Sequence, residues 1–151
     1  LKELKMLDTK PEERFDIITK EASKKFNVPI VTVSLIDGDR EWFKSRQGLH
    51  AKQGPRATSF CGHIMSNAYI LVIEDTLNDP RFSDNPQVIG KPYIRFYAGI
   101  TLNNKRRDLP VGVFCIKDTK PRKLSQEELH ALRDFAYRAE DELNKSLKIK
   151  K

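Results

Sequence analysis

The sequence has little cysteine and no long apolar run, and each absence excludes a class of protein. Cys61 and Cys115 are the only cysteines among 151 residues, which excludes the disulfide framework of small secreted domains. No apolar run approaches the roughly 18 residues that a membrane-spanning helix needs, and the start of the chain lacks a secretory signal pattern. We therefore expect a cytoplasmic protein that does not insert into a membrane.

The sequence also lacks the short motifs of several enzyme classes. It contains neither glycine-rich phosphate loop, Gly-x-Gly-x-x-Gly or Gly-x-x-x-x-Gly-Lys, and no nucleophilic serine elbow. The acidic pairs Glu12-Glu13 and Glu127-Glu128 fall in the first turns of predicted helices, where the helix dipole accounts for them. We therefore expect no cofactor, no metal and no catalytic residue, so that the domain is not itself an enzyme.

Positive charge is in excess, with a formal net charge of +7, but it is concentrated in two places. One cluster is the tail 145–151, and the other is Lys105-Arg106-Arg107, which separates two apolar runs and is typical of a hairpin tip. Neither cluster is interleaved with the aromatic residues on which bases stack. We expect a solvated basic surface and no nucleic-acid partner, with a nucleic-acid-binding module kept as a third hypothesis.

Large apolar side chains are plentiful, including 8 Phe and 4 Tyr, so the chain folds around a core of its own. The length fits one domain, which we place at residues 1–151 with its core at about 7–140. Residues 141–151 are expected to form a helical, basic exit toward an output domain. Because the chain begins at Leu1 and not at Met, we expect it to be a piece of a longer protein.

The pattern of apolar residues predicts helices at both ends and strands between them. Thr9 to Glu12 has the form of a capping box, and the apolar residues after it recur at helical spacing until Asn27 and Pro29. Gly48 to Thr58 is expected to be a loop, and Ser59 to cap a short helix. The remaining expected elements are strands 30–36, 41–47, 69–73, 95–102 and 109–116, a lid segment 75–92, and a last helix after the capping box Ser125 to Glu128.

The order of these elements predicts an α+β domain with a mostly antiparallel sheet, because the strands come in adjacent pairs without crossover helices. The last helix carries a narrow apolar seam that continues to Leu143 and Leu147, beyond the expected core. Such a seam is typical of helix pairing, so we expect these two leucines to face a partner helix.

Six segments of the chain, taken in order, resemble a GAF domain of the subgroup at the amino end of bacterial sensor histidine kinases and cyclic-di-GMP enzymes. The resemblance runs from about Leu7 to Ala139. The segments are 7–15, Val33-Ser-Leu-Ile-Asp37 with Trp42-Phe-Lys-Ser45, Ser59-Phe-Cys-Gly-His63, Asp79-Pro-Arg-Phe82, Ile94-Arg-Phe-Tyr-Ala-Gly99, and Gly112-Val-Phe-Cys-Ile116 with Asp118-Thr119.

This resemblance implies a central antiparallel sheet with the first and last helices on one face and lid segments over a pocket on the other. It also implies a regulatory domain that senses a small molecule, forms a homodimer through those helices, and signals to a kinase or cyclic-di-GMP domain in the same parent chain. The Asn-Lys signature of cyclic-nucleotide-binding relatives is missing near the last strand, so cAMP and cGMP are not expected. The residues expected to line the pocket are Phe60, His63, Ile64, Asp75, Phe82, Val88, Phe96 and Phe114.

Cys61-Gly-His63 leaves further alternatives open, because a thiolate and an imidazole are ligands for zinc and partners in thiol catalysis. Haem bound through His63 is another. Some GAF proteins reduce methionine sulfoxide with paired cysteines, so a thiol reductase that uses Cys61 or Cys115 is the alternative function. The simpler interpretation is that Cys61 packs in the core and His63 borders the pocket.

Overall fold

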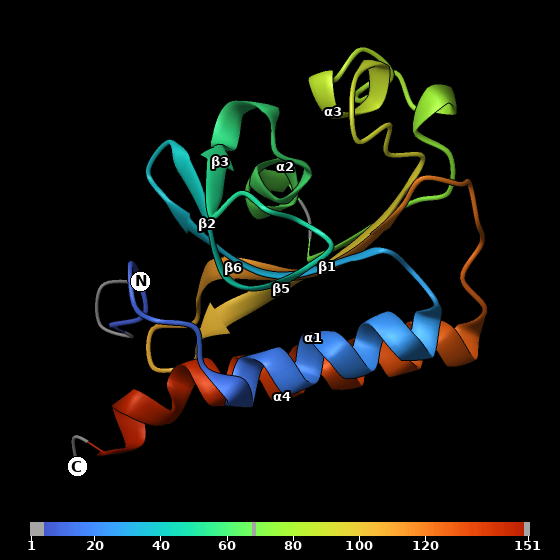
Figure 1. Cartoon of the computed structure of the whole chain (residues 1–151). Helices are drawn as coiled ribbons and strands as arrows, with labels where there is room; N and C mark the ends of the chain where they lie inside the picture. The colour runs from blue at the N-terminus through green and yellow to red at the C-terminus, as the bar shows by residue number, and fades with distance from the viewer. Residues whose placement is uncertain (1–4, 68, 150–151) are drawn as a thin grey trace.

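The structure, a computed structural model, describes residues 5–67 and 69–149, and the side chains of residues 66–67 and 146–149 are outside this description. Within these residues one six-stranded sheet lies between two helical layers (Figure 1). The elements are, in chain order, α1 (Glu13–Phe26), β1 (Ile30–Asp37), β2 (Arg40–Gln47), β3 (Gln53–Pro55), η2 (Arg56–Thr58), α2 (Phe60–Asn67), β4 (Ile70–Ile73), η3 (Thr76–Asn78), α3 (Pro86–Ile89), β5 (Phe96–Asn104), β6 (Leu109–Asp118) and α4 (Gln126–Ile149).

The sheet has the strand order β3-β2-β1-β6-β5-β4, and every neighbouring pair is antiparallel. The predicted fold class, α+β with an antiparallel sheet, is therefore confirmed. Gly38 makes the tight turn between β1 and β2 at a φ of +59°, a value that glycine adopts without a steric penalty. Lys105-Arg106-Arg107 falls in the turn between β5 and β6, as the sequence predicts.

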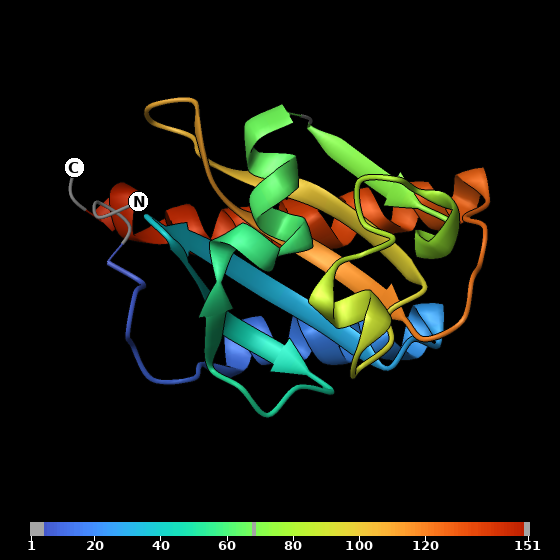
Figure 2. The same cartoon turned by 90° about the horizontal axis from the view of Figure 1, so that it is seen from above.

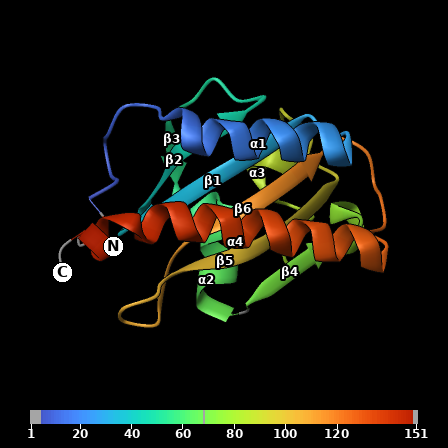
Figure 3. The same ribbon diagram turned by 90° about the horizontal axis from the view of Figure 1, so that it is seen from below.

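Helices α1 and α4 lie side by side across one face of the sheet, as Figure 3 shows. The buried side of α1 carries Phe15, Ile18, Ala22 and Phe26, spaced by three and four residues. These side chains share a hydrophobic core with α4 and with one face of β1, β5 and β6. Among the described residues, no helix combines the length and the apolar character that crossing a membrane requires.

The opposite face of the sheet is covered by α2, α3 and the irregular segment between β4 and β5, seen from above in Figure 2. A second, smaller core fills the space beneath them, where Phe60 of α2, Phe82 and Val88 meet Tyr97 of β5. The predicted lid segment 75–92 is thus a set of short helical turns that packs on the sheet. This layer holds most of the residues expected to line a pocket.

The prediction of a loop at Gly48 to Thr58 is wrong in its second half. Residues Gln53–Pro55 form the edge strand β3, which pairs with residues 40–42 of β2. Pro55 lacks a backbone N–H, and an edge strand tolerates it because one side of such a strand needs no ladder partner. The 3₁₀ turn η2 follows and leads directly into α2.

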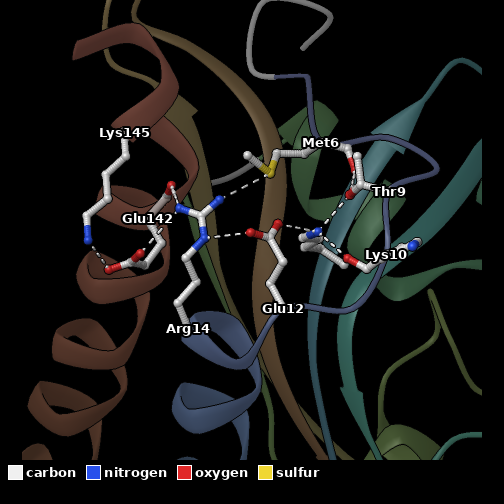
Figure 4. Close-up of polar contacts among 8 residues, drawn as sticks. Met6, Thr9, Lys10, Glu12, Arg14, Glu142 and Lys145 are labelled. Atoms are coloured by element: carbon white, nitrogen blue, oxygen red, sulfur yellow. Dashed lines mark hydrogen bonds and ion pairs between the residues drawn. The ribbon is translucent and has the colours of Figure 1, made fainter. Parts of the chain in front are cut away.

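The capping box predicted at Thr9 is also wrong, because α1 begins at Glu13 with Glu12 in the N-cap position. The hydroxyl of Thr9 donates to the carbonyl of Met6 and accepts a hydrogen bond from Lys44 Nζ at 2.6 Å. Glu12 lies between two cations, with its Oε2 2.6 Å from Lys44 Nζ and its Oε1 2.9 Å from Arg14 Nε. Figure 4 shows Glu12 beside Arg14 in this network. A buried lysine thus engages the two residues that were expected to cap the helix.

The second predicted capping box is confirmed at the start of α4. The backbone N–H of Glu128 donates to Ser125 Oγ at 3.1 Å, and the N–H of Ser125 donates to Glu128 Oε1 at 3.1 Å. Each side chain satisfies a backbone donor that the first helical turn leaves without a partner.

Replacing Ser125 by alanine is therefore expected to lower the free energy of unfolding by about 1 kcal/mol, measured by urea denaturation. The matched control is Ser83→Ala, because Ser83 lies in a turn and its side chain caps no helix. This control is expected to change stability by less than about 0.5 kcal/mol. Equal losses in the two variants would contradict the assignment of the cap.

Leu143 does not face a partner helix, and that prediction is wrong for this residue. Its side chain is fully buried in the chain's own core together with Phe15 and Met6, so the N-terminal segment and α1 cover this end of α4. The backbone of α4 continues to Ile149, whereas the side chain of Leu147 lies outside the described residues. Residues 150–151 of the predicted basic exit are outside them as well.

Candidate functional site

Four of the predicted pocket residues come together beneath α2. Phe60, Ile64, Phe82 and Val88 are all buried in the smaller core. The ring of Phe60 stacks between two others, with its centroid 4.8 Å from that of Phe82 and 5.1 Å from that of Tyr97. These predicted pocket residues thus pack against one another between α2 and the sheet.

His63 lies at the edge of this aromatic stack and is half-buried. Its ring meets that of Phe82 edge to face at a centroid distance of 5.1 Å. It borders a cavity of about 470 Å³ at the amino end of α2, which Arg56, Arg81 and Asn85 also line. His63 therefore borders a cavity, and its contact with a ligand stays a prediction.

The other three predicted residues lie elsewhere. Phe96 and Phe114 point to the opposite face of the sheet and belong to the core under α1 and α4, where Phe114 stacks on Phe135 at 6.2 Å. Asp75 caps the turn η3 by accepting a hydrogen bond from the N–H of Leu77 at 3.1 Å. The structure therefore does not bring these three side chains to the layer beneath α2.

A line of buried polar side chains crosses the sheet under α2. Thr32 Oγ1 of β1 lies 2.9 Å from Ser34 Oγ and 3.0 Å from Cys115 Sγ of β6, both hydrogen bonds. Cys115 is close enough to Cys61 of α2 to affect its pKa, and Cys61 Sγ accepts a hydrogen bond from Tyr97 OH at 3.3 Å. All five side chains are fully buried, so each depends on these partners for its polar atoms.

Two charged residues lie among these groups without an ion-pair partner in the described part of the chain. Lys117 of β6 is 3% exposed, and its Nζ lies 5.5 Å from the centroid of the Phe60 ring. Glu41 of β2 is also 3% exposed, and its Oε2 is buried with no hydrogen-bond partner. Burying a charge without a partner lowers the free energy of unfolding by roughly several kcal/mol. Two such residues are therefore unusual in a core.

The two thiols differ in acidity because their surroundings differ. Burial raises the pKa of Cys61 well above its ordinary value, and the neighbouring Cys115 and Glu41 raise it further. Burial also raises the pKa of Cys115, but the hydrogen bond from Cys61 and the charge of Lys117 outweigh it and lower the pKa overall. The pKa values of the two thiols are thus shifted in opposite directions, and the charge of Lys117 contributes to the lowering at Cys115.

Neither thiol forms a disulfide, and both are fully buried. Within the part of the chain that the structure describes, no three His, Cys, Asp or Glu side chains gather in a way that could hold a metal ion. Lys117 and Glu41 were missed from the sequence, although Lys117 stands two residues after Cys115 in a strand, which places the two side chains on one face.

The GAF domain family profile matches residues 10–143 of the chain. The chain is also 37% identical over 135 residues to a cyclic di-GMP phosphodiesterase of Pseudomonas aeruginosa. That match covers 89% of this chain but only 23% of the phosphodiesterase, so the chain corresponds to about a quarter of that protein.

Solved structures with the same fold include a GAF domain from an Acinetobacter phosphoenolpyruvate-protein phosphotransferase, with a TM-score of 0.73 and 14% identity over 98% of this chain and 92% of that one. The free methionine-R-sulfoxide reductase of Neisseria meningitidis is similar with a TM-score of 0.71 and 14% identity over 99% of this chain and 87% of that one. Identities this low show a common fold only. With the profile matching most of the chain, the protein belongs to the GAF domain family.

Proposed function

We propose that this GAF domain is a regulatory sensor that binds a small molecule beneath α2 and catalyses no reaction itself. The parent chain would be a cytoplasmic signalling protein, a histidine kinase or an enzyme that makes or degrades cyclic di-GMP, with its output domain after α4. The identity of 37% to part of a cyclic di-GMP phosphodiesterase supports this placement.

The observation that carries the proposal is the pair of buried charges between the sheet and α2. A purely structural role does not require Lys117 and Glu41 in this position, because replacing buried charges by apolar side chains of similar volume is often neutral or stabilising. A ligand that enters beside Phe60 would give the ammonium an anionic partner and the carboxylate a donor. The smaller core is also the layer that short turns cover, and such segments open at low cost in free energy.

The signal would pass through the sheet to the helical layer on its other face. β6 carries Cys115 and Lys117 toward α2 and Phe114 toward Phe135 of α4, so both layers pack on the same strand. We propose that α1 and α4 also pair with those of a second copy, where Ile17 and Tyr137 are 43% and 52% exposed. A ligand shifts this arrangement only if it binds one of its states more tightly than the other.

Native mass spectrometry of the protein as purified tests this function directly. We expect a dimer that carries an additional small-molecule mass, and we expect Lys117→Met to lose that mass while it keeps its fold. Lys120→Met is the matched control, because Lys120 is exposed and precedes α4 on a loop. A ligand-free protein that acquires no small molecule from a cell extract would contradict the sensor function and favour a role in pairing alone.

The alternative function is a thiol reductase, and the proximity of Cys61 and Cys115, which affect each other's pKa, is the observation in its favour. Full burial of both sulfurs opposes it, because a substrate must reach the attacking thiolate. Replacing both cysteines by serine separates the two functions. Ligand binding and dimer formation are expected to persist in a sensor, whereas reduction of free methionine sulfoxide would disappear in a reductase.

A further inference from the structure

A second cavity lies at the β2 edge of the sheet and shares no residue with the one beside His63. Its volume is about 640 Å³, and its walls are the N-terminal segment 8–11, the first turns of α1, and residues 42–47 of β2. Leu49 and Lys52 close the remaining side. The strand β3 pairs only with residues 40–42 of β2, so the rest of this edge borders the cavity and not another strand.

Unpaired positive charge gathers around this cavity. Its lining includes Lys10, Lys20, Arg46 and Lys52, and none of the four forms an ion pair with a carboxylate in the described part of the chain. The guanidinium of Arg46 is held in place by one bond, from its Nε to the carbonyl of Leu49 at 3.1 Å.

Of the two acidic residues of the lining, Asp8 has an ion-pair partner, whereas Asp16 is hydrogen-bonded by a neutral hydroxyl and keeps its negative charge among the four cations. Asp8 pairs with Arg40 at 2.9 Å, and Asp16 Oδ1 accepts a hydrogen bond from Ser45 Oγ at 2.6 Å. Arg14, Arg40, Arg81, Arg122 and Arg138 all have carboxylate partners, in contrast to Arg46. The cavity therefore presents a local excess of positive charge that the protein itself does not neutralise.

We propose that this cavity binds a small phosphorylated molecule. Its volume is within the range of about 300–1,000 Å³ that small-molecule sites have, which favours a compact ligand over an extended macromolecule. Several cations around one concave surface suit a phosphate, since its oxygens accept hydrogen bonds from ammonium and guanidinium groups together. The inference is independent of the sensor site beneath α2, because the two sites lie in different parts of the fold.

A ligand here would touch the ion-pair network of Figure 4. Lys44, Thr9 and Lys10 line the cavity, and Lys44 Nζ holds the carbonyl of Lys10 at 2.8 Å and Glu12 at 2.6 Å. From Glu12 the network continues to Arg14, whose Nη1 donates to the Glu142 carbonyl of α4 at 2.9 Å. Occupation of the cavity is therefore expected to slow amide hydrogen exchange at the end of α4.

The test is a titration of the ¹⁵N-labelled chain with inorganic pyrophosphate at constant ionic strength, followed by amide chemical shifts. We expect saturable shifts that are largest at residues 8–11, 16–20 and 42–52, with half-saturation below about 1 mM. The double variant Arg46→Gln/Lys52→Gln is expected to weaken binding at least about fivefold. The matched control Lys24→Gln/Lys25→Gln removes the same charge from the other end of α1 and is expected to leave binding unchanged.

Three results would overturn the proposal. Equal weakening by the two double variants would mean that the affinity for pyrophosphate depends only on the net charge of the protein. The absence of saturable shifts would mean that the cavity binds no phosphate. Tighter binding of a polyglutamate peptide at the same residues would identify an acidic protein segment as the occupant. If the Arg46→Gln/Lys52→Gln protein does not fold, Lys10→Gln/Lys20→Gln makes the same test, because both lysines are exposed.

Discussion

Replacing Leu143 by alanine is expected to lower the free energy of unfolding of the single chain by about 3 kcal/mol. The side chain is fully buried in the core that also contains Phe15 and Met6, and its truncation removes apolar contacts and leaves a cavity in that core. Urea denaturation followed by the fluorescence of Trp42 measures the loss. The loss is expected to be the same across protein concentrations, because the contacts lie within one chain.

The matched control for Leu143 is Leu109→Ala, the same change at a leucine that is 55% exposed at the start of β6. It is expected to change stability by less than about 0.5 kcal/mol. A Leu143→Ala protein that keeps the stability of its single chain but dissociates more readily as a dimer would contradict this assignment. Such a result would indicate that Leu143 belongs to a surface that pairs with a helix of a second copy.

The case of Leu143 shows what helical periodicity leaves undetermined. A seam with spacings of three and four residues is the same whether it packs on a sheet or on a partner helix. Earlier along the same seam, Leu132, Ala136 and Ala139 lie on the buried side of α4. Where the core ends depends on segments distant in sequence, here Met6 and the start of α1, and no local pattern contains that information.

The two capping-box motifs of the chain also show that a local pattern does not determine contacts with distant segments. One motif forms its predicted bonds and the other does not. Ser125 and Glu128 have no stronger partners nearby and form the reciprocal bonds that their spacing predicts. Thr9 and Glu12 have the same spacing, but Lys44 of β2 lies between them and engages both. The contacts of the buried Lys44 ammonium replace the local capping bonds. Leaving that charge without partners would destabilise the fold more than leaving the end of the helix uncapped.

The sequence predicts the layer in which the candidate site lies, but not which side chains of the sheet face that layer. The aromatic and branched residues of α2 and the lid segment identify the layer over the sheet. In β5 and β6, however, apolar residues occupy both faces, so alternation does not tell which side each residue faces. Phe96 and Phe114 were therefore assigned to the pocket, while their neighbours Tyr97 and Cys115 are the residues that point there.

Replacing Glu12 by glutamine is expected to destabilise the chain by about 2 kcal/mol near neutral pH, because the fully buried Lys44 side chain loses its counter-charge. Partial burial raises the pKa of Glu12, but the hydrogen bonds from Arg14 and Lys44 outweigh it and hold the pKa below the ordinary 4.5. A carboxylate whose pKa is lowered by folding stabilises the folded state above its unfolded pKa. That stabilisation is lost as the pH falls through the lower folded pKa.

The difference in unfolding free energy between the wild type and Glu12→Gln is therefore expected to be full above the ordinary pKa of 4.5 and to shrink as the pH falls below it, through the lower folded pKa. Urea denaturation at a series of pH values measures it. Glu21→Gln is the matched control, because Glu21 pairs with Arg138 at 2.7 Å but both side chains are largely exposed, so solvent screens the pair. A pH-independent difference for Glu12→Gln would show that Glu12 stabilises the chain through packing. The Lys44 ammonium would then need no negatively charged partner to hold the N-terminal segment.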